Sequence, residues 1–145
     1  MHAKKIDLSR FLEAQNKMYL TAFNELSQGK KETHWMWFIF PQLRGLGSSE
    51  NAVFYGIHDL TEATIYLEHP ILGKHLEEMA ALLLTYKHRA IETIFNELDT
   101  RKLRSSMTLF SQIPNACPLF QEIISVFFFG SNDPLTSDSI TASTV

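Results

Sequence analysis

The sequence predicts a single all-α domain of about seven helices. Three observations favour this class: several segments repeat apolar residues every three or four positions, no strand-like run alternates with them, and glycine and proline separate the helical segments. The chain has 145 residues, the usual size of one domain, and hydrophobic residues make up 45% of it. We expect the domain to span residues 1–136 and residues 137–145 to form a loose polar tail.

The first helix is predicted between Asp7 and Gly29. Asp7 can cap its start, and Gly29 can adopt the left-handed conformation that ends a helix. The apolar residues between them recur at three- and four-residue spacing, so they form one stripe along the helix. That stripe consists of Leu8, Phe11, Leu12, Tyr19, Ala22, Phe23 and Leu26.

The run at residues 34–40 is apolar on every face and stops at Pro41. Periodicity alone does not distinguish a buried helix from a buried strand in so short a run. Because no second strand-like run is present to pair with it, and a lone strand is not stable, we predict a short helix. A loop with two glycines follows over residues 41–49, and another short helix is predicted over residues 50–55.

Asp59 and Glu62 have the spacing of a capping box, which predicts a helix that begins there and continues to about residue 68. Pro70 breaks this helix and suits the first turn of the next one, which runs to Lys87. The apolar stripe of that second long helix consists of Leu72, Leu76, Met79, Ala80 and Leu83.

Further helices are predicted after residue 89. A short one covers residues 90–95. The next is capped by Asp99 and continues through Ile113, where Pro114 ends it. The last runs from residue 119 to residue 129 and is closed by Gly130.

Composition and charge argue against several classes of protein. The formal net charge is −3 and the pI is about 6.0, which argue against nucleic-acid binding through the cations at residues 101–104, the weakest of the possible functions. The apolar runs are far shorter than a membrane span, and the N-terminus has no apolar segment of the secretory kind, so we expect no membrane contact. Cys117 is the only cysteine and no internal disulfide forms, which favours a reducing, cytoplasmic setting.

The densest group of polar and aromatic residues lies at residues 34–49. Gly45 and Gly47 permit positive φ angles and a close approach of the backbone to a ligand. The backbone N–H groups of such a turn, up to Ser48, form an anion-binding concavity, and the helix that follows adds the positive end of its dipole. Arg44 supplies a guanidinium fork that matches phosphate or carboxylate.

The same segment offers surfaces for the rest of a ligand. Trp35 and Trp37 can present a flat face to a base or ring, and Gln42 can fix the orientation of the ligand. The alternative is that the glycines only turn the chain and the tryptophans only fill the core, which is the commoner use of aromatic residues.

A second cluster, at residues 101–108, places three cations and three hydroxyl groups in the first two turns of a predicted helix. Cations near a helix N-terminus oppose the helix dipole, so an acidic partner or an anionic ligand would explain them. Lys102, Ser105 and Ser106 lie on one face of this helix. The alternative is a solvated basic face whose serine hydroxyls bond back to the backbone.

The remaining titratable residues form no recognisable metal-binding or nucleophilic pattern, and the sequence points to no particular cofactor. The histidines are scattered, so we expect no metal site. His34 is the candidate general acid–base residue if the protein is an enzyme, although a structural hydrogen-bonding role is commoner. Cys117 has no identifiable partner base, which argues against a nucleophilic role.

Three segments carry a resemblance to a known family. They are HWMWFIFPQLRGLG at residues 34–47, YLEHPILG at residues 66–73 and KLRSSMTLF at residues 102–110. They resemble the bacterial domain-of-unknown-function family 1810, sometimes mislabelled calpastatin, and the resemblance runs from about Asp7 to about Thr136. It implies an all-α, multihelical fold whose helices stack in a right-handed, repeat-like superhelix. It implies no activity.

These observations lead to two hypotheses of function. The first is a protein that binds an anionic or nucleotide-like small molecule between the glycine turn and the helix carrying Lys102, and that acts on this ligand if it is an enzyme. It requires Arg44, His34 and Lys102 to converge on one concave site. The second is a helical protein–protein interaction module without catalysis, which predicts an exposed apolar patch and no deep pocket.

Overall fold

The apolar stripes of the sequence become the buried faces of packed helices. The structure is a computed structural model that describes residues 6–143, with side chains up to residue 141. The predicted all-α class is confirmed, and none of the described helices has the length and apolar character needed to cross a bilayer. The helices are α1 (Ser9–Ser27), α2 (Met36–Ile39), α3 (Glu50–Phe54), α4 (Leu60–Glu68), α5 (Leu72–Leu84), the 3₁₀-helix η1 (Ile91–Thr93), α6 (Glu97–Ser111), α7 (Leu119–Phe127) and α8 (Pro134–Ser143).

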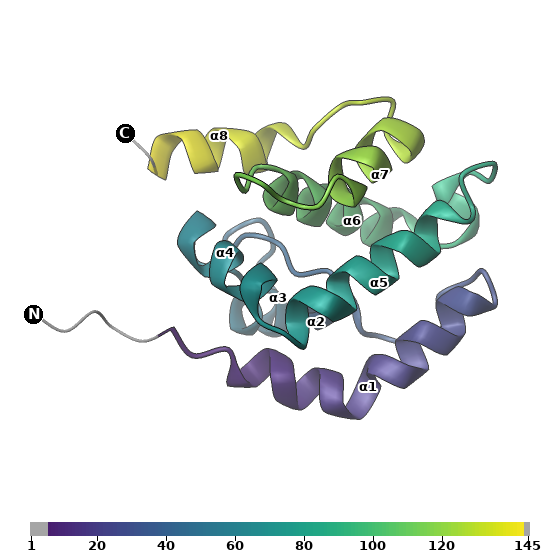
Figure 1. Cartoon of the computed structure of the whole chain (residues 1–145), viewed down its shortest axis with the longest axis horizontal. Coiled ribbons are helices and arrows are strands. Elements are labelled where there is room, and N and C mark those ends of the chain that lie inside the picture. The colour runs from purple at the N-terminus through teal and green to yellow at the C-terminus, as the bar shows by residue number, and fades with distance from the viewer. Residues whose placement is uncertain (1–5, 144–145) are drawn as a thin grey trace, which may run out of the picture.

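The helices pack in layers around one core. Helix α5 packs against α1, α4 and α7, while α6 packs against α2, α4, α7 and α8. In Figure 1, α1 lies on one side of the molecule and α6, α7 and α8 on the other, with α5 and α2–α4 between them. An isolated parallel bridge between Leu43 and Ile57 joins the glycine-containing loop to the segment that follows α3.

Short polar side chains cap α3, α4 and α6. Ser49 and Asp59 each accept a hydrogen bond from the backbone N–H of the third residue of their helix. The prediction that Asp99 caps α6 is wrong. The cap is Asn96, whose side chain accepts a hydrogen bond from the backbone N–H of Asp99. The Asp99 carboxylate is instead held by Lys31, whose Nζ lies 2.9 Å away.

Helix α8 occupies much of the segment for which a loose tail is predicted from residue 137. Asp133 Oδ2 accepts a hydrogen bond from Thr136 N at the start of this helix. Thr136 is fully buried, and Ile140 packs against the core. Capping and apolar burial thus make residues 137–143 helical rather than loose, and residues 144–145 lie outside the described residues.

A polar network crosses the core between α1, α2, α4 and α5. Gln15 is 2% exposed, and its Nε2 donates to Phe38 O at 2.7 Å and to Tyr66 Oη at 2.9 Å. Its Oε1 lies 2.7 Å from His75 Nδ1, which therefore carries the hydrogen, since an amide oxygen only accepts. The His75 ring stacks on Tyr19 with ring centroids 3.6 Å apart. The side-chain amide of Gln15 thus provides a hydrogen-bond partner for one polar group from each of α2, α4 and α5.

His75 is expected to make stability depend on pH. Burial of its ring lowers its pKa from the ordinary value of 6.5, an effect that Glu78 opposes and Lys74 reinforces. The unfolded chain therefore takes up this proton more readily than the folded chain, so the free energy of unfolding falls as the pH drops below about 6.5. Thermal melts at about pH 7.5 and about pH 5.5 should show a larger loss of Tm in the wild type than in His75→Gln.

The matched control is His88→Gln, because His88 is exposed. This variant should keep the pH dependence of the wild type. Equal losses of Tm in the wild type and in His75→Gln would contradict the prediction.

Candidate ligand-binding site

The two predicted clusters meet, but the space between them is nearly filled. Trp37, Gln42 and Lys102 line one cavity of about 10 Å³, which is room for about one water molecule. Lys102 Nζ lies 4.8 Å from the centre of the Trp37 ring. A nucleotide-sized ligand does not fit in this cavity, so the predicted position of the ligand, between the glycine turn and Lys102, is closed in this structure.

Trp35 belongs to the core. It is fully buried, and its Nε1 donates to Glu25 Oε1 at 2.9 Å. The same oxygen accepts hydrogen bonds from the backbone N–H groups of Glu32 and Thr33. Burial raises the pKa of the Glu25 carboxyl, but these hydrogen bonds and one from the Thr33 hydroxyl outweigh burial and lower the pKa to about 2. Trp35 thus presents no free face to a ligand, and we leave it out of the proposed site.

The two serines of α6 are engaged in the interior. Ser105 Oγ donates to Arg101 O at 3.1 Å and to Asp133 Oδ2 at 3.2 Å, next to the start of α8. Ser106 is fully buried, and its Oγ has no hydrogen-bond partner among the described residues. Neither serine lines the hollow that contains Arg44, so we do not assign them to the ligand.

The three residues that the first hypothesis brings together line three different hollows. His34 is exposed and lines a hollow of about 250 Å³ beside η1 and the start of α6. Lys102 lines the small closed cavity, and Arg44 lines a third, open hollow. The structure therefore does not gather the three residues around one hollow.

The hollow that contains Arg44 is open and has a volume of about 880 Å³, within the usual range for small-molecule sites. Arg44 is exposed, and its guanidinium group has no hydrogen bond or ion pair within the described part of the chain. Ser48 lines the same hollow. The other lining residues are Arg10, Glu50, Asn51, Val53, Phe54, Tyr55 and His58.

Glycine is required at two positions of the turn that carries Arg44. Gly45 has a φ of 100°, and a Cβ at Gly47 would lie 2.9 Å from a side-chain atom of α3. Two backbone hydrogen bonds fix the turn against the segment after α3. They run from Arg44 N to Ile57 O at 2.8 Å and from Ile57 N to Gln42 O at 2.9 Å. The turn therefore holds the Arg44 backbone beside the connection between α3 and α4.

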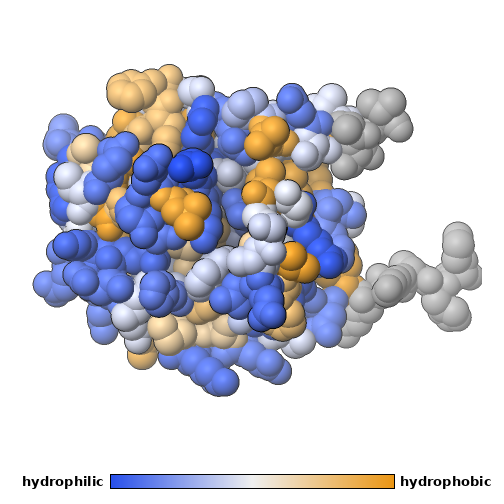
Figure 2. All heavy atoms as spheres, turned by 180° about the vertical axis from the view of Figure 1, so that it is seen from behind, coloured by the Kyte–Doolittle hydropathy of each residue, from blue (hydrophilic) through white to orange (hydrophobic). Residues whose placement is uncertain are grey.

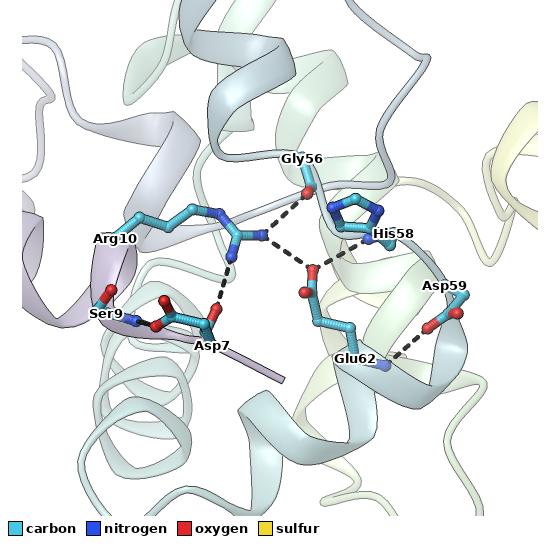
Figure 3. Close-up of polar contacts among 7 residues, drawn as sticks. All are labelled: Asp7, Ser9, Arg10, Gly56, His58, Asp59 and Glu62. Carbon is cyan, nitrogen blue, oxygen red and sulfur yellow. Dashed lines mark hydrogen bonds and ion pairs between the residues drawn. The ribbon is translucent and has the colours of Figure 1, made fainter. Parts of the chain in front are cut away.

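An adjoining hollow of about 520 Å³ shares Arg10, Phe54 and His58 with the hollow of Arg44. Figure 3 shows its wall, where Arg10 Nη2 donates to Glu62 Oε1 at 3.0 Å and to Gly56 O at 3.1 Å. The backbone N–H of His58 donates to the same carboxylate oxygen at 3.1 Å. The ion pair is largely buried, with 16% of the arginine side chain and 7% of the glutamate side chain exposed. It holds the Arg10 guanidinium at the junction of the two hollows.

The charges of the two hollows differ. Asp7, Glu13 and Asp59 line the smaller hollow together with the paired Arg10 and Glu62, so that hollow is acidic. The larger hollow contains the unpaired Arg44, with Glu50 as its acidic residue. Phe54 is 59% exposed on the rim that they share. An anion with an apolar part therefore fits the hollow of Arg44 better than its neighbour.

Sequence reasoning did not identify Arg10, His58 or Glu62. The spacing of Asp59 and Glu62 predicts a helix start, and the structure confirms it, with Asp59 as the cap. The Glu62 carboxylate has a further role, because it pairs with an arginine from α1. Arg10 lies 52 residues away from Glu62 in the chain. No local spacing connects them, so only the three-dimensional fold reveals the pair.

Across residues 6–143, no group of three or more histidine, cysteine, aspartate or glutamate side chains is placed to hold a metal ion.

Comparisons with known proteins identify relatives of the chain. The model of a family described as "Protein of unknown function (DUF1810)" matches residues 5–140. Among solved structures, the crystal structure of the conserved hypothetical protein Rv1873 from Mycobacterium tuberculosis is similar, with 45% sequence identity and a TM-score of 0.91. That match covers 93% of this chain and 96% of the other chain. The comparison with curated proteins found no match.

Proposed function

Because the chain belongs to the DUF1810 family, whose description names no activity, we propose its function from its own geometry: it binds an anionic, nucleotide-like small molecule in the hollow of Arg44. The guanidinium group of Arg44 binds the phosphate or carboxylate of the ligand through charge-assisted hydrogen bonds. Ser48 adds a hydroxyl donor from the same turn, and Phe54 offers a flat apolar surface to a ring.

One observation carries this proposal, namely the state of Arg44. Its guanidinium group has no partner within the described residues, on a glycine-dependent turn beside a hollow of about 880 Å³. The neighbouring Arg10 already has a buried carboxylate partner. An anionic ligand would give Arg44 the partner that the described residues do not supply, and the volume of the hollow is within the usual range for small-molecule sites.

The alternative function, a protein–protein interaction module, predicts one continuous apolar patch. The large exposed apolar residues are instead distributed over several helices and turns. They are Leu20, Val53, Phe54, Ile65, Ile71, Leu98, Phe129 and Leu135. On the face seen in Figure 2, apolar side chains form separate groups among hydrophilic ones. This distribution favours the small-molecule function.

The proposal predicts that Arg44→Ala removes most of the affinity for anions. Loss of a charge-assisted hydrogen-bonded pair costs about 1.5–3 kcal/mol, which is roughly a 10- to 100-fold rise in Kd. Thermal-shift titrations with pyrophosphate, adenosine diphosphate and a sugar phosphate should raise the Tm of the wild type by about 3 °C near saturation. The same ligands should leave the Tm of Arg44→Ala unchanged.

The matched control is Arg101→Ala, because Arg101 is exposed and its ion-pair partner within residues 6–143 is the exposed Glu97 of its own helix. This variant should respond to the anions like the wild type. The proposal fails if none of the three anions raises the Tm of the wild type, or if Arg44→Ala responds as strongly. The proposal is one of binding, since His34 lines a different hollow and no catalytic step is assigned to it.

A further inference from the structure

A second cationic cluster lies inside the molecule, where α6 meets α2. Asp99 Oδ2 lies 2.9 Å from Lys31 Nζ, and Asp99 Oδ1 lies 3.9 Å from Lys102 Nζ. The three side chains are largely buried, with 8% of Lys31, 10% of Asp99 and 14% of Lys102 exposed. Two cations therefore share one carboxylate, and this largely buried cluster carries a formal net charge of +1, with Lys31 and Asp99 also lining the hollow of His34. Such a charge is costly unless another group compensates it.

One buried hydrogen-bond donor beside this cluster lacks an acceptor, and two neighbouring side chains have donors that no described residue uses. Trp37 Nε1 is buried and has no partner among the described residues. The side-chain amide of Gln42 makes no hydrogen bond there either. Lys102 carries three donors, but its nearest carboxylate oxygen is 3.9 Å away, beyond good hydrogen-bond distance. An indole N–H and an ammonium group can only donate, so what is missing is an acceptor.

The cavity that these three side chains line could hold such an acceptor. Its volume is about 10 Å³, enough for one particle of the size of water. The rest of its wall is mostly apolar, with Met36, Phe40 and Ala52 among the lining residues. Among the lining side chains, only those of Gln42 and Tyr55 carry an oxygen that could accept a hydrogen bond. One side of the cavity is the flexible Lys102 side chain, which can shift by a few tenths of an ångström to admit a slightly larger ion.

We propose that this cavity is a binding site for one chloride ion, held by Trp37 Nε1–H and the Lys102 ammonium group. The ion neutralises the excess positive charge that Lys31 and Lys102 leave beside Asp99. Desolvation lowers the pKa of Lys102, Asp99 opposes this effect and Lys31 adds to it; a bound anion would favour the charged form of this amine. The inference concerns the small cavity lined by Trp37 and Lys102 and is independent of the ligand proposed for the hollow of Arg44.

The test compares thermal melts in sodium chloride and in sodium gluconate at equal ionic strength, with no other ligand present. Gluconate is too large for the cavity, so screening is matched while site occupancy is not. We expect a Tm about 3 °C higher in chloride at concentrations well above the Kd. Lys102→Met should abolish this difference, because it removes the charged donor and leaves the Lys31–Asp99 pair in place. Lys74→Met changes an exposed lysine and should keep the difference.

Fluorescence gives a second readout that does not require a stable Lys102 variant. The chain has two tryptophans, and bromide in the cavity would quench the fluorescence of Trp37. Saturable quenching by bromide, competed by chloride and absent in Trp37→Phe, is the expected result. Equal Tm values in chloride and gluconate together with non-saturable quenching would overturn the proposal and leave a water molecule as the occupant. A chloride effect that persists in Lys102→Met would overturn it as well.

Discussion

Replacing Gln15 by leucine is expected to lower the free energy of unfolding by about 4 kcal/mol. Leucine has a similar size, but it provides none of the three hydrogen bonds of the amide. The variant would leave Phe38 O, Tyr66 Oη and His75 Nδ1 without their partner in the interior. Each buried polar group left unsatisfied costs about 1–3 kcal/mol, and the three costs fall on one site. Urea denaturation followed by circular dichroism measures the change.

The neighbouring residue supplies the control for Gln15. Asn16 is exposed, so Asn16→Ala should change the free energy of unfolding by less than about 0.5 kcal/mol. The double variant Gln15→Leu, Tyr66→Phe should lose less stability than the sum of the two single changes. Gln15→Leu already leaves the Tyr66 hydroxyl without its hydrogen-bond partner, and Tyr66→Phe then removes that hydroxyl. A loss below about 1 kcal/mol for Gln15→Leu would show that the network contributes little.

Gly73→Ala is expected to cost about 3 kcal/mol, although alanine normally favours a helix. Gly73 lies in the first turn of α5, where the chain returns from α4. A Cβ at this position would lie 2.0 Å from the carbonyl oxygen of Leu67. That atom belongs to the backbone of α4, so the two helices must move apart to relieve the overlap, and their contact is part of the core. The measurement is the Tm, which should fall by about 10 °C.

Lys74→Ala is the matched control for this change, because Lys74 is the next residue of α5 and is exposed. It should leave the Tm within about 2 °C of the wild type. If Gly73→Ala raised the Tm, as a gain in helix propensity alone would do, then the close approach of α4 and α5 would not limit the stability of the fold.

Local sequence patterns predict those parts of the fold that depend on neighbouring residues. The apolar stripe of α1 and the capping spacing of Asp59 and Glu62 act within one or two turns, and both appear in the structure as expected. The cap of α6 illustrates where this approach ends. Asn96 and Asp99 are both good capping residues, and the choice between them depends on Lys31, which is distant in sequence. The same holds for residues 137–143, whose helix α8 packs against α6, an element more than 20 residues earlier in the chain.

The candidate site was predictable only in part. The glycine turn identifies Arg44 and Ser48, because backbone freedom and a guanidinium group are local features. The position of the hollow is not local, since Arg10 from α1 and His58 from the segment before α4 also line it. The tryptophans show the limit most clearly. Trp35 and Trp37 are two residues apart, yet their indole N–H groups differ. The N–H of Trp35 donates a hydrogen bond to Glu25, whereas that of Trp37 has no acceptor among the described residues.

The most direct test of the proposed function is the location of anion binding on the protein. A two-dimensional ¹H–¹⁵N NMR titration with pyrophosphate, at constant ionic strength, reports this residue by residue. The account predicts saturable shifts in the backbone signals of Arg44, Ser48 and His58 and in the side-chain signal of Arg44, with little change at Arg101. Saturable shifts confined to other surfaces, or no saturable shift at the glycine turn with any of the three anions, would contradict it.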